Sequence, residues 1–149
     1  PRTYISSLGR VRMLHPQGGT ELLGQRIIQM PVDAMRLLNR DPHSTFIAYV
    51  PRGSVSKGEQ LVKTGGISHL PCESCHGEGL RGMGDVPRIA GLQPVYITRQ
   101  LLSIQSGHSA GEGVALMKPV VEHLSLDDII AISAYVGSLS PINSLTANN

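Results

Sequence analysis

One short segment, residues 72–76 with the sequence Cys-Glu-Ser-Cys-His, contains both cysteines of the chain and constrains its fold more than any other feature. Sites of three kinds use cysteines at this spacing. A thioredoxin-like thiol pair follows a buried strand and needs a first cysteine of low pKa, whereas residues 63–71 have the composition of a loop. A structural zinc site needs four ligands, commonly from two cysteine pairs, and this chain has one pair.

The third kind of site is covalent haem attachment, for which C-x-x-C-H is the motif. The thiols of Cys72 and Cys75 lie on one turn of the chain and can form thioethers to both vinyl groups of a haem. The next residue, His76, then directs its imidazole toward the iron. The motif therefore predicts one covalently bound haem c, and no disulfide is expected because both thiols are consumed.

The composition agrees with a large buried prosthetic group. The 149 residues include four tyrosines, one phenylalanine and no tryptophan, although aromatic side chains normally supply much of a small core. The net charge of +2 is too small to indicate nucleic-acid binding, and no apolar run reaches the roughly 18 residues of a membrane span. Because no leader follows Pro1, we expect a processed or truncated chain. Covalent haem attachment implies that the protein is exported to the periplasm.

An electron-carrying haem iron needs a second strong ligand on its far face, and methionine and histidine are the candidates. Met117 lies 41 residues after the histidine of the motif, far enough for a helix and a return loop, and Pro119 would stiffen the ligand-bearing loop. His108 and His123 remain open as alternatives. We predict Met117 as the second ligand. The methionines expected to fill gaps in a core are Met30, Met35 and Met83.

Three helices are predicted, each with a start and a stop signal. The first spans about 57–64, where a capping box begins at Ser56 and two glycines follow the last turn. The second spans about 94–106, with proline at its first position and glycine after its end. The third is capped by Ser125 and stopped by Pro141, and aspartates occupy its first turn.

These residues resemble a class I cytochrome c domain, and most of all the C-terminal haem module and inter-domain segment of bacterial two-domain dihaem cytochromes c. The resemblance covers about residues 55–140. It rests on the segments 72–77, 86–92, Tyr96, 99–101, Gly107, Met117, 124–125, 128–129 and 134–135 in that order.

The resemblance implies an all-α cytochrome c fold with about three main helices around a covalent haem. It also implies His76 and Met117 as axial ligands, and a Pro87 carbonyl that accepts a hydrogen bond from the ring of His76. Arg88 would lie near a haem propionate. Tyr96 is expected to pack in the core, at a helix crossing or at the haem edge.

Residues 1–53 contain no haem motif. We expect them to form an extended arm with little regular structure, which either wraps the haem domain at 54–149 or docks a partner. The stretches 18–28 and 41–51 are similar to the inter-domain region of a dihaem family, in which another cytochrome domain comes first. The arm has seven arginines and three acidic residues, so its charge could orient a redox partner.

The predicted function is electron transfer rather than catalysis. An iron with His76 and Met117 on its two faces has no open position for a substrate or oxygen. The chain would take one electron from a periplasmic dehydrogenase or a quinol-oxidising complex and pass it to an oxidase or another cytochrome. The alternative is a haem enzyme or gas sensor with an open distal site, peroxidase-like, which requires that Met117 does not bind the iron.

Overall fold

The computed structural model describes residues 1–66 and 70–140. The chain divides into two compact units, Pro1–Pro51 and Arg52–Asn149. This division lies two residues before the boundary expected between arm and haem domain. The predicted helix stop at Pro141 lies outside the described residues.

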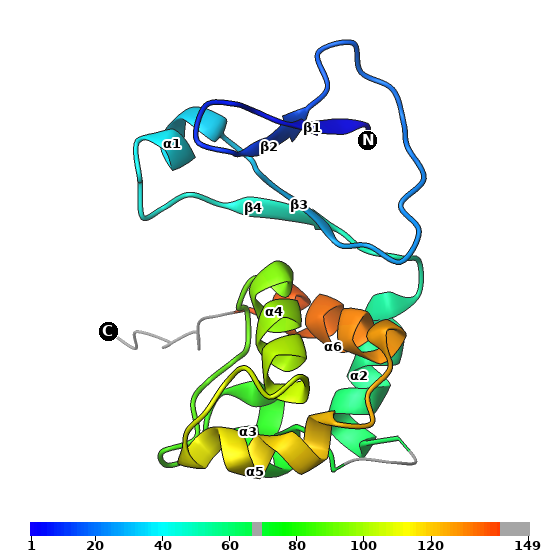
Figure 1. The fold of residues 1–149 in the computed structure, drawn as a ribbon, viewed down its shortest axis with the longest axis vertical. Helices are drawn as coiled ribbons and strands as arrows, with labels where there is room; N and C mark the ends of the chain where they lie inside the picture. Colours follow the sequence, from blue (N-terminus) through cyan, green and yellow to red (C-terminus); the bar gives the residue numbers. More distant parts are fainter. Residues whose placement is uncertain (67–69, 141–149) are drawn as a thin grey trace, which may run out of the picture. The chain divides into compact units, whose positions relative to one another are not determined.

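The first unit contains two small antiparallel ribbons. Met30 of one ribbon faces Ile47, and Ile28 and Met30 are buried. Figure 1 shows a short helix in the connection between the two strands of this ribbon. The regular elements are β1 (Thr3–Ile5) paired with β2 (Arg12–Leu14), β3 (Ile28–Pro31) paired with β4 (Phe46–Tyr49), and α1 (Ala34–Leu38).

These elements agree with the expected scarcity of regular structure, because the unit has four strands of three or four residues and one helix of five. The expectation of an extended arm is wrong, since the unit is compact. The extended segments expected near residues 27–28 and 46–50 correspond to β3 and β4. Their pairing with each other was not anticipated.

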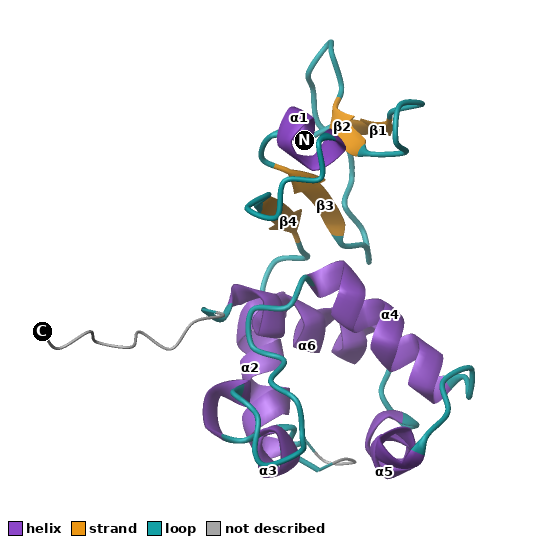
Figure 2. Ribbon diagram, turned by 90° about the vertical axis from the view of Figure 1, so that its left-hand side faces the viewer, coloured by secondary structure: helices purple, strands orange, loops and turns teal. Residues whose placement is uncertain are grey.

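The second unit is built from helices, and within its described residues no strand is formed (Figure 2). The helix predicted at 94–106 and the helix predicted after Ser125 match closely in extent, whereas the helix predicted at 57–64 begins three residues earlier, at Ser54. The helices are α2 (Ser54–Thr64), α3 (Glu73–His76), the 3-10 turn η1 (Glu78–Leu80), α4 (Pro94–Gln105), α5 (Glu112–Val121) and α6 (Leu126–Ser138).

The capping box predicted at Ser56 is wrong, whereas the cap at Ser125 is confirmed. Gly53 precedes α2 in a left-handed conformation, and its carbonyl accepts from the Lys57 amide at 3.0 Å. Ser56 is therefore already helical and cannot adopt the extended backbone that a cap needs. At α6, the Ser125 hydroxyl accepts from the Asp128 amide at 3.1 Å, and the Asp128 carboxylate accepts from the Ser125 amide.

The first and last helices cross at a point where only glycine fits. A Cβ at Gly58 of α2 would lie 2.0 Å from the carbonyl oxygen of Ala131 and 2.8 Å from Cβ of Tyr135. Tyr135 is buried at this crossing. A Cβ at Gly137 would likewise collide with the Pro94 ring at the start of α4.

The core of the second unit forms where α2, α4 and α6 meet. The hydroxyl groups of Thr98 and Ser133 lie 2.9 Å apart between α4 and α6. Apolar side chains supply the rest of this core: Val62, Leu80, Ala90, Ile97, Leu101, Ile104, Val121, Leu124, Ile129, Ile132, Tyr135 and Val136.

Candidate haem site

The attachment motif folds as one short turn of helix. The amide of His76 donates to the Cys72 carbonyl at 2.9 Å, and α3 runs from Glu73 to His76. Both cysteines are free thiols. Residues three apart on a helix lie on one face, so the turn presents Cys72 and Cys75 to the same side.

The environment of Cys72 argues against the thioredoxin-like alternative. Burial raises the pKa of the Cys72 thiol to about 11. A redox-active first cysteine needs the opposite shift, because the thiolate is the nucleophile. The zinc alternative also lacks support, since no group of three or more potential metal ligands forms within residues 1–66 and 70–140.

The ring of His76 is oriented by a backbone carbonyl. His76 is buried, and its Nδ1 lies 2.8 Å from the carbonyl oxygen of Pro87. With Nδ1 protonated and donating to this carbonyl, Nε2 keeps its lone pair and can bind a metal. The resemblance to cytochromes implied the same contact.

The loop that carries Pro87 is held by its own backbone. The Gly82 amide donates to the His76 carbonyl at 2.7 Å, and Met83 forms an isolated bridge with Val86. The Leu80 carbonyl accepts from the amides of residues 89 and 90. A Cβ at Gly82 would approach the Arg88 amide to 2.9 Å, so the loop closes only around glycine.

Met117 lies in α5, which the sequence analysis missed. Its side chain is partly buried and packs against the core. The expectation of a loop stiffened by Pro119 is wrong, because Pro119 is inside the helix. Proline at this position removes one helical hydrogen bond and crowds the carbonyl four residues earlier, but Val121 anchors the same helix in the core.

The three methionines predicted to fill gaps in a core differ in burial. Met30 is buried as expected, whereas Met35 and Met83 are 62% and 56% exposed, so the core role expected for these two is wrong. The exposure of Met83 leaves it outside the packed interior, whereas Met117 contacts that interior.

The motif helix and the methionine helix occupy the same end of the second unit. In Figure 2, α3 and α5 lie on opposite sides below α4 and α6. The donor set suits a covalently attached haem: two thiols on one face of α3, an imidazole with Nε2 available, and a thioether on a separate helix. Cys72, Cys75, His76 and Met117 would hold the group.

The two remaining predicted contacts lie at the surface. Arg88 is exposed in the loop after Pro87, and its contact with a propionate stays a prediction. Tyr96 is 47% exposed on α4. Core packing is therefore wrong for Tyr96, because the apolar stripe of α4 faces the other way, through Ile97, Leu101 and Ile104.

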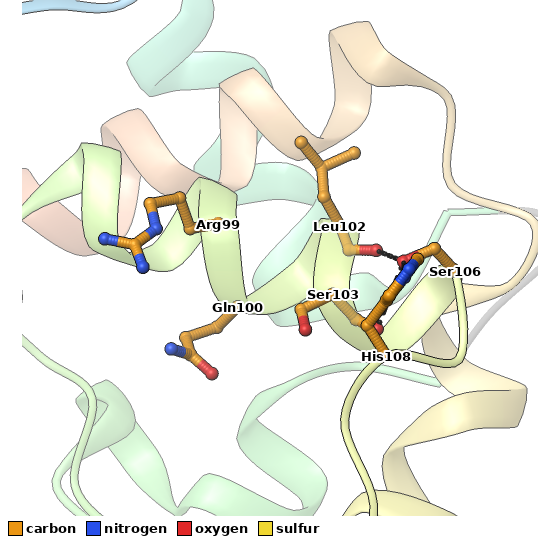
Figure 3. A pocket seen from close by; sticks show the side chains of 6 residues that line it. All are labelled: Arg99, Gln100, Leu102, Ser103, Ser106 and His108. Atoms are coloured by element: carbon orange, nitrogen blue, oxygen red, sulfur yellow. Dashed lines mark hydrogen bonds between the residues drawn. The ribbon is translucent and has the colours of Figure 1, made fainter.

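An open depression of about 350 Å³ lies along the polar side of α4 and was missed by the sequence analysis (Figure 3). A signal was available in the polar residues Gln100, Ser103 and Ser106, which recur every three positions. His108, earlier an alternative iron ligand, lines the depression with its Nδ1 2.7 Å from the Ser106 hydroxyl. The other lining residues are Arg99 and Leu102.

No helix within the described residues is long and apolar enough to cross a membrane.

Sequence comparison finds cytochromes among curated proteins. The chain is 30% identical over 87 residues to cytochrome c-554(548) of Halomonas halodenitrificans and covers 96% of that protein. It is 33% identical over 91 residues to cytochrome c4 of Pseudomonas aeruginosa, covering 57% of this chain and 45% of the relative. Cytochrome c4 of Stutzerimonas stutzeri matches 93% of this chain at 23% identity, over 72% of its own length. No protein-family model matches.

Solved structures confirm the predicted fold class. Reduced cytochrome c4 from Pseudomonas stutzeri superposes on 62% of this chain with a TM-score of 0.53 and 27% identity, and the chain covers 51% of it. The thiosulfate dehydrogenase TsdBA from Marichromatium purpuratum matches 60% of this chain with a TM-score of 0.50 and 33% identity, over 19% of that protein. The chain thus spans about half the length of the solved cytochrome c4.

Proposed function

We propose that this chain carries one haem c, attached at Cys72 and Cys75, with His76 and Met117 as its axial ligands. The chain belongs to the class I c-type cytochrome family and serves electron transfer. The observation that carries this assignment is the 2.8 Å contact between His76 Nδ1 and the Pro87 carbonyl, next to two free thiols on one turn. A haem in such a site stores and releases one electron at its iron.

The residues of the chain have separate tasks in this proposal. Cys72 and Cys75 tether the cofactor covalently, so that it is retained through each redox cycle. The Pro87 carbonyl holds the ring of His76 in one tautomer and increases its basicity. The thioether of Met117 favours the ferrous state and raises the reduction potential.

With both faces of the iron occupied, the chain would act as a carrier or an electron-transfer subunit rather than as an enzyme. The donor would be a periplasmic dehydrogenase or a quinol-oxidising complex, and the acceptor an oxidase or another cytochrome. The likeness to a thiosulfate dehydrogenase supports the role of a subunit in a redox complex. Covalent haem attachment implies a periplasmic location.

The attachment is tested by denaturing the protein in acid and extracting it with organic solvent, followed by intact mass measurement. We expect the colour to stay with the polypeptide and the mass to increase by one haem. Colour that leaves the polypeptide would refute the proposal. A high-spin ferric spectrum with tight carbon monoxide binding in the ferrous form would support the open-site alternative instead.

A further inference from the structure

Two arginines in the first unit have a backbone conformation that normally requires glycine. Within the described residues, the non-glycine residues with positive φ are Arg10 (52°), Arg40 (56°) and Leu80 (60°). L-residues seldom adopt this conformation, because Cβ crowds the following carbonyl. The other left-handed positions of the unit are glycines: Gly9, Gly18, Gly19 and Gly24.

The fold brings these two strained positions into one region. Arg10 follows Gly9 in the turn between β1 and β2, and Arg40 lies two residues after Leu38, the last residue of α1. A Cβ built on Gly9 would lie 2.8 Å from Cδ2 of Leu38. The turn therefore packs against the end of α1, near which the turn runs in Figure 1.

No ion pair within the described residues includes Arg10 or Arg40, and both side chains are exposed. The unit has six arginines, no lysine and three acidic residues. Each acid is engaged elsewhere: Asp41 pairs with Arg36 at 3.5 Å, Asp33 caps α1, and Glu21 accepts from the Thr3 hydroxyl.

The same turn and the same short helix also expose apolar side chains. Leu8, in the same turn as Arg10, is 67% exposed, and Met35 of α1 is 62% exposed. Arginine and methionine are enriched in protein interfaces, where lysine is depleted. We call Leu8, Arg10, Met35, Arg36 and Arg40 the arginine patch.

We infer that the arginine patch docks an acidic face of a partner protein. Holding two exposed arginines in this conformation costs stability, and strained positions of this kind cluster at ligand clamps and other functional sites. A guanidinium binds a carboxylate with two parallel hydrogen bonds, which lysine cannot do. The absence of lysine and the small apolar area favour carboxylates over an anionic lipid surface. This inference is independent of the haem ligands, and its test uses no redox readout.

The test compares variants of the haem-loaded chain. R10G with R40G removes two charges and relieves the backbone strain, while R2G with R26G removes two charges elsewhere in the unit. The probe is a fluorescein-labelled decamer of glutamate at low ionic strength. We expect R10G/R40G to bind the decamer at least about fivefold more weakly than the wild type does, with a melting temperature equal to or higher than that of the wild type.

The control variant R2G/R26G should bind within about twofold of the wild type, and binding by the wild type should fall between 0.01 M and 0.15 M salt. Equal loss in both variants would overturn the inference, because net charge alone would then explain binding. It would also be overturned if the wild type binds vesicles of phosphatidylglycerol and phosphatidylcholine but not the decamer, or binds neither. A lower melting temperature of R10G/R40G would show that the arginines serve the fold.

Discussion

In the proposed centre, the sulfur of Met117 would serve as a ligand, whereas the carbonyl of Pro87 would act through the ring of His76. The carbonyl is placed by a loop whose backbone bonds next to Pro87 are short-range in sequence, although the Gly91 amide at the end of the loop donates to the Val136 carbonyl of α6. Met117 comes from a helix that contacts the core, so its position depends on the packing of the whole second unit. Loss of the first contact would alter the basicity of His76, whereas loss of Met117 would remove a ligand.

Replacing Met117 with alanine should open one face of the iron and lower the reduction potential. Axial ligands set haem potentials over about 0.8 V, and we expect a fall of roughly 0.1 V or more. The covalent attachment should persist, because the thioethers are untouched. Redox titration and carbon monoxide binding measure the two effects.

Met83→Ala is the matched control, because Met83 is exposed and bridges only to Val86 through its backbone. It should leave the potential and the spectrum unchanged. If Met83→Ala alters both and Met117→Ala alters neither, the ligand assignment is wrong.

The helices of the second unit are joined by contacts of two kinds. Glycines allow α2 and α4 to approach α6 at backbone distance. An ion pair then links the beginnings of two helices: Lys57 Nζ lies 2.6 Å from Asp127 and 2.8 Å from Asp128. The close approach of the helices stabilises the fold by packing. The ion pair adds a contribution to stability that depends on pH.

Gly58→Ala should destabilise the protein by about 3 kcal/mol, because the new methyl group meets the Ala131 carbonyl, which cannot move without displacing α6. Gly113→Ala in α5 is the control. Its Cβ would meet nothing within 4 Å, so helix propensity should make it neutral or stabilising by up to about 1 kcal/mol. Urea unfolding compares the two variants, and equal midpoints would refute the proposed crossing.

The contribution of Asp128 to the stability of the fold should depend on pH. Burial alone would raise the pKa of Asp128, but hydrogen bonds from Lys57 and Ser125 lower it below 3.8. A carboxyl whose pKa is lower in the folded state stabilises above its unfolded pKa, and that stability is lost as the pH falls through the folded value. Hydrogen bonds to Asp127 and Asp128 raise the pKa of Lys57 above 10.5, so its contribution is lost only as the pH rises through that higher value.

Asp128→Asn should therefore cost about 1 kcal/mol at neutral pH, from the weakened cap and ion pair together. The difference from the wild type should shrink below about pH 4. Thermal melting across pH 2–8 tests this, with Asp85→Asn, at an exposed loop position, as control. A difference that is constant with pH would show that the carboxylate charge contributes nothing.

The two units of the molecule differ in what stabilises them. Every residue of the main core cluster belongs to the second unit. The first unit has two ribbons and one short helix, with Ile28 and Met30 as its buried apolar residues. The proposed haem ligands and the main core therefore lie in one unit, and the arginine patch lies in the other.

A chain shortened to residues 52–149 should keep the haem spectrum of the full chain, because all the proposed ligands and the core cluster remain. Absorption spectra in both oxidation states and thermal melting test this. A lost methionine–iron signature or failure to incorporate haem would show that the first unit contributes to the site.

The features that could be predicted from the sequence alone are those that depend on residues close together in the chain. The attachment motif, the proline and glycine that delimit α4, and the cap of α6 all depend on residues within a few positions of one another, so their spacing is informative before folding. Electron transfer could also be predicted from the sequence, because the attachment motif is followed by Met117 as a candidate for the second iron ligand. The paired strands β3 and β4 were visible only as separate extended segments.

Tertiary packing decided the rest. The sequence suggested a loop at Met117, but contact with the core stabilises a helix there despite Pro119. The need for glycine at position 58 is set by Ala131, and the juxtaposition of Arg10 and Arg40 by Gly9 and Leu38. These contacts join residues distant in sequence, and their distances depend on how whole elements approach one another, which no local pattern encodes.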